Sequence, residues 1–201
     1  MLKDKVVLVT GAASGIGRAI ALVAAREGAH LVLADLDAHA GNETLRLVRA
    51  LGREALFAAS DVGQPGDAQA LVDQTMAHFG RLDVACNNAG IGGPSALLAD
   101  YPLDGWAQVI NVNLSGVFYG MRCQIPALLR SGGGSIVNVA SILGAVGFAT
   151  AAAYTAAKHG VLGLTQTAAL EYSAQGVRVN AVGPGFIQTP MISALDADPT
   201  V

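Results

Sequence analysis

Short runs of apolar, often β-branched residues alternate along the chain with longer stretches of helical character. The runs predict strands, because each is nearly continuous in hydrophobicity, as expected of strands buried on both faces of a sheet. They cover residues 6–10, 30–35, 55–61, 82–90, 134–141 and 177–185. Helices are predicted between them at 15–27, 38–51, 65–79, 103–130 and 151–175. Pro126 is expected to kink the 103–130 helix or to start its last turns.

This alternation of strands and helices is typical of βαβ units around a parallel sheet. Because crossovers between parallel strands are right-handed, the simplest topology is a doubly wound sheet with helices on both faces, which is a three-layer α/β fold. The sequence contains no long linker, internal repeat or low-complexity tract. We therefore expect residues 1–201 to form a single domain.

The composition of the chain indicates which kinds of binding partner to expect. Hydrophobic residues make up 52% of the chain and charged residues only 13%, whereas about 25% of residues are charged in a typical domain. So few charges would leave apolar surface on a monomer, which predicts association with other chains. The net charge of −3, without any basic run, argues against a nucleic-acid partner.

The sequence shows no targeting or metal-binding pattern. The apolar run near the N-terminus is too short for a signal peptide, and no segment approaches the roughly 20 apolar residues of a membrane span. Cys86 and Cys123 match no zinc or redox spacing, and the 4 histidines lack the paired spacing of metal ligands. We expect a cytoplasmic protein that binds neither a metal ion nor a membrane.

A glycine-rich segment, TGAASGIG at residues 10–17, follows the first predicted strand and opens the first predicted helix. Glycine allows the backbone to turn sharply and to approach a ligand that a Cβ atom would exclude. The helix N-terminus behind it offers free N–H groups and a partial positive charge, which suit a pyrophosphate. Its place in an alternating chain predicts a dinucleotide site with the candidate residues Gly11, Ser14, Gly15, Ile16 and Gly17.

Asp35 ends the second predicted strand, eighteen residues beyond Gly17. A carboxylate there can accept hydrogen bonds from the adenosine ribose and would repel a 2′-phosphate. Neither Ser14 nor Leu36 offers a basic partner for such a phosphate. The sequence therefore predicts NAD rather than NADP.

Tyr154 and Lys158 stand four positions apart in the segment YTAAK, so they share one face of a predicted helix. Lys158 is the only charged residue between Ala151 and Leu170. Taken alone, the pair has an ordinary explanation, in which a tyrosine packs and a lysine stem covers apolar surface.

Several further motifs accompany this pair. They are Asp61–Val62, NNAG at 87–90, NVNLSG at 111–116, Ser141 and NAVGPGFIQT at 180–189. With TGAASGIG and YTAAK, in this order and at these spacings, they closely resemble the short-chain dehydrogenase/reductase family over essentially the whole chain. The resemblance implies a Rossmann fold with the strand order 3-2-1-4-5-6. It also implies a final edge strand, which we expect to be absent from this chain.

The resemblance implies a role for each matching residue. The implied catalytic residues are Asn113, Ser141, Tyr154 and Lys158. The implied cofactor contacts beyond the glycine loop and Asp35 are Asp61 and Val62 beside the adenine, Asn88, Ala89 and Gly90 along the cofactor, and Pro184, Gly185, Ile187 and Thr189 around the nicotinamide, with Tyr154 and Lys158 contributing to both sets.

The implied chemistry is hydride transfer between NAD(H) and a secondary alcohol or ketone. Tyr154 would act as general acid and base, and the Lys158 ammonium with the positive nicotinamide would favour its phenolate. Ser141 would bond the substrate oxygen, and Asn113 would hold a water molecule in a proton relay to solvent. The alternative is a nucleotide-binding regulator or scaffold of the same fold that turns over no substrate.

The predicted substrate end of the site is largely apolar, at 91–94, 142–148 and 186–192. This favours an uncharged body, but sugars, steroids, acyl thioesters and small ketones stay open. The outer side of the 151–175 helix lacks charge, and the 103–130 helix carries Phe118, Tyr119 and Met121. Since such helices are normally buried, we expect a homodimer or homotetramer through these two helices.

Overall fold

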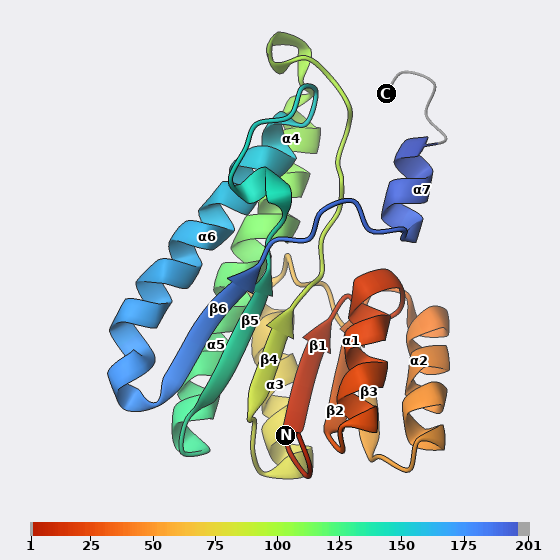
Figure 1. The fold of residues 1–201 in the computed structure, drawn as a ribbon, viewed down its shortest axis with the longest axis vertical. Helices are drawn as coiled ribbons and strands as arrows, with labels where there is room; N and C mark the ends of the chain where they lie inside the picture. The colour runs from red at the N-terminus through yellow and green to blue at the C-terminus, as the bar shows by residue number, and fades with distance from the viewer. Residues whose placement is uncertain (1, 197–201) are drawn as a thin grey trace.

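The computed structural model describes residues 2–196 of the chain and contains a six-stranded parallel sheet (Figure 1). Its order is β3-β2-β1-β4-β5-β6, which confirms the predicted doubly wound topology. The strands are β1 (Val6–Thr10), β2 (His30–Asp35), β3 (Ala55–Ala59), β4 (Val84–Asn87), β5 (Gly134–Val139) and β6 (Val177–Val182).

Helices lie on both faces of the sheet and complete the three layers (Figure 1). They are α1 (Gly15–Arg26), α2 (Ala38–Ala50), α3 (Pro65–Phe79), α4 (Leu103–Ile110), α5 (Gly116–Arg130), α6 (Ala152–Tyr172) and α7 (Pro190–Asp196). Helices α1 and α2 pack on one face, over β1–β3, and α3, α5 and α6 pack on the other. Within residues 2–196, no helix is long and apolar enough to cross a membrane.

The central strand β1 shows why its sequence is continuously apolar. Val6 and Leu8 belong to the hydrophobic cluster beneath α3, α5 and α6, whereas Val7 and Val9 belong to the cluster beneath α1 and α2. All four are at most 2% exposed. Successive side chains of a strand point to opposite faces, so a strand covered on both faces needs apolar residues at every position.

Four strands end earlier than their apolar runs predict. The last residues of β3, β4, β5 and β6 are Ala59, Asn87, Val139 and Val182, two or three positions before the predicted ends. The residues that follow leave the sheet and form the wall of a cleft, described below. Hydrophobicity alone does not mark this change, because the loop residues are also small or apolar.

The predicted 103–130 helix is divided into α4, a π-helical turn at Asn111–Ser115, and α5. The Gly116 N–H donates to the Asn111 carbonyl, five positions back, as this wider turn requires. Pro126 lies inside α5, which continues to Arg130. The interruption is therefore at the π-turn and not at Pro126, and such turns often mark functional sites.

A buried carboxylate ties β1 to the start of β4. Asp83 is 6% exposed and accepts hydrogen bonds from Arg81 Nε and Nη2 (2.8 and 2.6 Å), Lys5 Nζ (3.0 Å) and the Val6 N–H (2.9 Å). Burial alone would raise the pKa of Asp83, but the hydrogen bonds from Arg81, Val6 and Lys5 outweigh it, so the pKa lies below its ordinary value. The ionised carboxylate is thus favoured by folding.

A carboxylate whose pKa falls on folding stabilises the protein above its unfolded pKa and ceases to do so as the pH drops through its folded pKa. We expect Asp83→Asn to lower the free energy of unfolding at pH 7 by about 2 kcal/mol, measured in urea. The difference from wild type should shrink as the pH falls below about 4, where wild-type Asp83 becomes protonated.

The exposed pair of Arg53 with Asp4 provides the control, since its carboxylate side chain is 64% exposed. Asp4→Asn should change stability by less than about 0.5 kcal/mol. A difference in unfolding free energy between wild type and Asp83→Asn that stays constant from pH 7 to about pH 2.5, roughly 1.4 units below the ordinary aspartate pKa, would contradict the assignment.

Candidate active site

A cleft of about 480 Å³ opens at the carboxyl ends of the strands, where the strand order reverses between β1 and β4. Ligands of doubly wound sheets bind at this point. The predicted residues that line it are Gly11, Ser14, Gly15, Ile16, Asp35, Asp61, Val62, Asn88, Ala89, Gly90, Ser141, Tyr154, Lys158, Pro184, Gly185, Ile187 and Thr189. Two predicted residues, Gly17 and Asn113, lie behind the wall and do not line it.

The glycine loop leaves room for a ligand at the start of α1. Gly11 has φ +65°, which favours glycine, and a Cβ atom on Gly17 would overlap the Gly11 carbonyl oxygen. Ser14 is the N-cap residue of α1, yet its side chain makes no capping hydrogen bond. An exposed hydroxyl and the free N–H groups of a helix N-terminus therefore face the cleft together, as an anion site requires.

Asp35 holds the glycine loop while lining the cleft. Its Oδ2 accepts from the Ala13 N–H (2.8 Å) and its Oδ1 accepts from the Asp37 N–H (3.1 Å). A carboxylate oxygen can accept a second hydrogen bond, so both oxygens keep capacity for ligand hydroxyls. Among the described residues that line the cleft, Lys158 is the one with a basic side chain.

The end of β1 is clamped to the segment after β4. The Thr10 hydroxyl oxygen accepts from the N–H groups of Asn88 (3.0 Å) and Ala89 (3.1 Å), and Asn88 Nδ2 donates to the Thr10 carbonyl (2.9 Å). Thr10 is 5% exposed. This clamp fixes the two strand ends between which the cleft opens.

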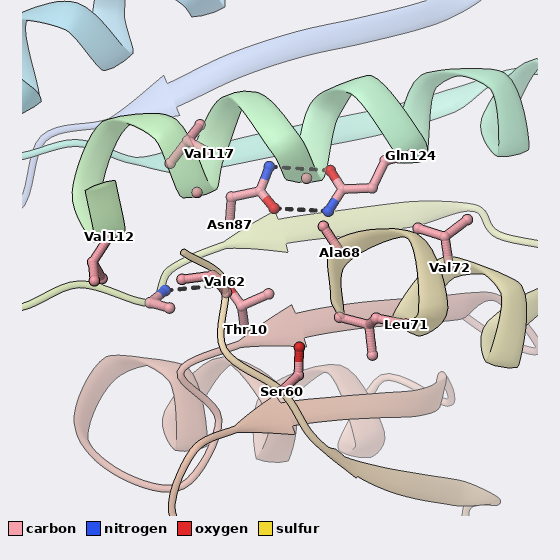
Figure 2. A pocket seen from close by; sticks show the side chains of 13 residues that line it. Thr10, Ser60, Val62, Ala68, Leu71, Val72, Asn87, Val112, Val117 and Gln124 are labelled. Atoms are coloured by element: carbon pink, nitrogen blue, oxygen red, sulfur yellow. Dashed lines mark hydrogen bonds between the residues drawn. The ribbon is translucent and has the colours of Figure 1, made fainter. Parts of the chain in front are cut away.

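Asp61 and Val62 form the wall beyond β3. Asp61 Oδ1 accepts from the Gly63 N–H (2.9 Å), which shapes the turn. Behind Val62 lies a second cavity of about 20 Å³ that Ser60, Leu71 and Val117 also line (Figure 2). This volume suffices for about one water molecule, and the buried Ser60 hydroxyl has no hydrogen-bond partner among the described residues.

Tyr154, Ser141 and Lys158 meet at the opposite end of the cleft. Burial raises the pKa of Tyr154, and a hydrogen bond with the Ser141 side chain partly offsets this effect. The Lys158 Nζ lies 5.5 Å from the centre of the Tyr154 ring. A phenol, a hydroxyl and an amine thus converge at one place that is largely shielded from solvent.

Lys158 is 4% exposed, and its Nζ donates to the Val139 carbonyl at 2.8 Å. Burial lowers the pKa of Lys158 to about 8. The ammonium is therefore held by a neutral carbonyl rather than by a carboxylate, which leaves its charge available to a neighbour. The acidic side chains among the described residues that line the cleft are those of Asp35, at the end of β2, and Asp61, in the loop after β3.

Within the described part of the chain, no group of three or more His, Cys, Asp or Glu side chains is placed to hold a metal ion. Cys86 and Cys123 are buried free thiols. Burial raises the pKa of both, that of Cys86 to about 11, so neither is primed as a thiolate.

The chain matches a known protein family over nearly its whole length. The model of the family described as short chain dehydrogenase matches residues 5–200 of the chain. The chain belongs to the short-chain dehydrogenase family.

Named relatives of this short-chain dehydrogenase include alcohol-oxidising proteins. Cyclohexanol dehydrogenase of Acinetobacter sp. (strain SE19) is 44% identical over 193 residues, which cover 96% of this chain and 77% of the relative. Cis-4-hydroxycyclohexanecarboxylate dehydrogenase of Sinomonas cyclohexanicum is also 44% identical, over 97% of this chain and 78% of the relative. The structure of carveol dehydrogenase from Mycobacterium avium in complex with NAD superposes with a TM-score of 0.92 at 34% identity, covering 94% and 73% of the two chains.

In this short-chain dehydrogenase, Asn113 holds a loop. Its side chain is fully buried in the π-turn; Nδ2 donates to the Ile91 carbonyl and Oδ1 accepts from the Ile91 N–H, both at 2.8 Å. Nδ2 has a second N–H and Oδ1 has a second lone pair, so the side chain could still bond a water molecule. The water-holding role of Asn113 stays a prediction.

Some residues of the site were not singled out from the sequence. Thr10 is part of the TGAASGIG motif, but its clamp on Asn88 and Ala89 appears only in three dimensions. Gln108 also lines the cleft and belongs to no motif, whereas Ile91 and Met191 fall within the predicted apolar segments 91–94 and 186–192. Gln108 is one of two polar residues on α4, with Asp104, and this was the available signal.

Proposed function

We propose that this short-chain dehydrogenase interconverts secondary alcohols and ketones with NAD(H), using Tyr154 as general acid and base. The observation that carries the proposal is the convergence of Tyr154, Ser141 and Lys158 at one end of a cleft whose other end has the features of a dinucleotide site. A phenol beside a buried amine suits proton transfer, and the long cleft suits a large cofactor.

The residues of the cleft fit NAD. The glycine loop is a cradle that a Cβ atom on Gly17 would fill, and the free Ser14 hydroxyl lies at the α1 N-terminus where a pyrophosphate would be bound. Asp35 would accept hydrogen bonds from the adenosine ribose. When bound, NAD would supply the hydride acceptor for oxidation. Carveol dehydrogenase, which is similar in fold, has been solved in complex with NAD.

The proton would move through the Tyr154 hydroxyl. A phenol with a raised pKa donates its proton to a nascent alkoxide during reduction, and its phenolate accepts the alcohol proton during oxidation. The Lys158 ammonium stabilises the phenolate by charge, and this effect is large because water is largely excluded. Ser141 would donate to the substrate oxygen and hold it near Tyr154.

The substrate is proposed to be an uncharged cyclic secondary alcohol. The lining of the cleft includes Ile91, Pro184, Ile187 and Met191, all without charge. Among the described residues that line the cleft, Lys158 is the one basic side chain, and in the proposed mechanism its charge serves Tyr154. Cyclohexanol dehydrogenase, a relative at 44% identity, carries the name of such a substrate.

We expect NADH to form when the protein is given NAD and cyclohexanol. Tyr154→Phe keeps the ring but removes the proton carrier, so kcat should fall by about a thousandfold while NAD still binds. Absorbance of NADH and calorimetry measure the two effects. Tyr172→Phe, at the other end of α6, is the matched control and should keep full turnover. NAD binding without turnover of any secondary alcohol would instead favour the regulator or scaffold.

Cofactor choice gives a second test. Because Asp35 would repel a 2′-phosphate, NAD should bind at least about tenfold tighter than NADP, or about 1.4 kcal/mol. Asp35→Ala should reduce this preference, mainly by strengthening NADP binding. Titration calorimetry with both cofactors measures it, and equal affinities in the wild type would show that Asp35 does not select.

We also propose at least a homodimer through α4–α5 and α6. On the outer side of these helices, Trp106, Phe118 and Leu170 are 40%, 46% and 84% exposed. The exposed Gly163 of α6 has open space where a Cβ atom would project. A dimer would bury the apolar outer side of these helices, whereas a monomer would expose it to water.

Light scattering at micromolar concentration should therefore report a dimer or a larger assembly. Gly163→Glu should dissociate it, because a charge would be forced into the contact while the fold of one subunit has room for the side chain. Gly66→Glu is the control, since Gly66 on α3 is equally open but lies outside the proposed contact. A monomeric wild type would refute the assembly.

A further inference from the structure

Four polar side chains form a row through the apolar core between α5 and α6. Each comes from a different element: Gln124 from α5, Asn87 from β4, Asn138 from β5 and Thr165 from α6. None is more than 7% exposed. The packing of two helices on a sheet needs no such row, because apolar side chains serve that purpose without any desolvation cost.

The row is a continuous chain of hydrogen bonds. Gln124 and Asn87 exchange two bonds, of 3.1 and 2.8 Å, between their amide groups (Figure 2). Asn87 Nδ2 also donates to Asn138 Oδ1 (2.9 Å), and Asn138 Nδ2 donates to Thr165 Oγ1 (2.9 Å). The Thr165 hydroxyl completes the chain by donating to the Val161 carbonyl (2.7 Å).

These bonds fix the orientation of every member. Asn138 uses one N–H on Thr165 and directs the other to Met121 Sδ (3.3 Å), while its oxygen accepts from Asn87. Removing the Thr165 hydroxyl would leave a buried N–H of Asn138 without its oxygen acceptor. The side chain of Asn138 would then have to rotate or the helix would have to shift.

The row of hydrogen bonds ends beside Lys158. Thr165 and Val161 share a helix face with Lys158, at positions seven and three beyond it. Asn138 directly precedes Val139, whose carbonyl holds Lys158 Nζ at 2.8 Å. Helix α6 is therefore bonded to consecutive residues of β5 at two points, and these set its height and its rotation on the sheet.

We propose that Asn138 and Thr165, supported by Gln124 through Asn87, are positioning residues that fix Lys158 and Tyr154 for proton transfer. The inference rests on the proposed function of Tyr154. If α6 were released at Thr165, the Lys158 ammonium would be held less closely to the phenol and would favour the phenolate less. Neither Asn138 nor Thr165 lines the cleft, so they act through α6 and β5.

Few other charges can produce such an effect. Tyr154 and Lys158 lie close together, with Ser141 and the Val139 carbonyl beside them. The described acidic groups of the cleft are Asp35, at the end of β2, and Asp61, in the loop after β3. His159 on α6 is exposed, with its ring Nδ1 beside the Thr155 carbonyl. Described residues of α4 and α5 that line the cleft bring no charge to it.

The experiment replaces Thr165 by valine, which has the same shape without the hydroxyl. With NAD and a secondary alcohol, kcat should fall by about tenfold and KM for NAD should change by less than about twofold. The apparent pKa of the rise of kcat with pH should move upward by about half a unit. Thr165→Ser retains the hydroxyl and should restore both values.

Thr75→Val is the matched control for a merely structural effect. Thr75 is fully buried on α3 and its hydroxyl donates to the Leu71 carbonyl four positions back, as the Thr165 hydroxyl does to Val161. Unlike Thr165, Thr75 accepts no hydrogen bond from a side-chain amide of the sheet among the described residues. The Thr75→Val variant should lower the stability of the fold and leave the pH profile of kcat unchanged. If Thr165→Val behaves in the same way, the positioning role is overturned.

A second variant keeps the test decisive if Thr165→Val does not fold. Gln124→Met removes the hydrogen bonds at the far end of the polar row and leaves α6 intact. It should therefore shift the pH profile of kcat in the same direction by a smaller amount. An unchanged profile would overturn the proposal.

A direct measurement separates this inference from the proposed function. The phenolate absorbance of wild type minus that of Tyr154→Phe reports the pKa of Tyr154 without any turnover. If no alcohol is oxidised, the proposed function fails, while an upward shift of this pKa in Thr165→Val would still support the positioning role. An unshifted pKa would overturn it.

Discussion

The burial of one ammonium group constrains the part of the structure that holds the proposed proton-transfer residues. Lys158 is 4% exposed, and its Nζ donates to the Val139 carbonyl and lies 5.5 Å from the centre of the Tyr154 ring. A lone buried charge is costly, and burial accordingly lowers its pKa to about 8. Placing it there requires a long apolar helix, a strand that ends at the right residue, and a sheet rigid enough to keep the two together.

The same constraint explains the polar row in an otherwise apolar core. Leucine and valine side chains can fill the space between α6 and β5, but they specify the height and rotation of a helix only loosely. Hydrogen bonds such as that of Asn138 to Thr165 have narrow distance and angle requirements. A site that depends on the distance between an amine and a phenol gains from that precision.

The other half of the cleft depends on space rather than on charge. Gly17 must lack a side chain because the Gly11 carbonyl occupies the position of its Cβ atom, and Asp35 draws the loop inward through the Ala13 N–H. Thr10 then fixes this loop to the segment after β4. The glycine-loop cradle and the proposed catalytic residues meet only because the parallel strands all end at one edge of the sheet.

The apolar pattern by itself determined the layers, because doubly covered strands must be apolar throughout. The strand order and most of the cleft wall followed from the resemblance of the loop motifs to the short-chain dehydrogenase/reductase family. The apolar pattern misjudged the strand ends and the division of the 103–130 helix, since β3, β4, β5 and β6 pass into loops that are equally small or apolar. Only the tertiary structure decided that Asn113 bonds Ile91 and that Gln124 reaches Thr165 through two asparagines. Those bonds join residues distant in the chain, and their partners are chosen by packing geometry, which no local pattern records.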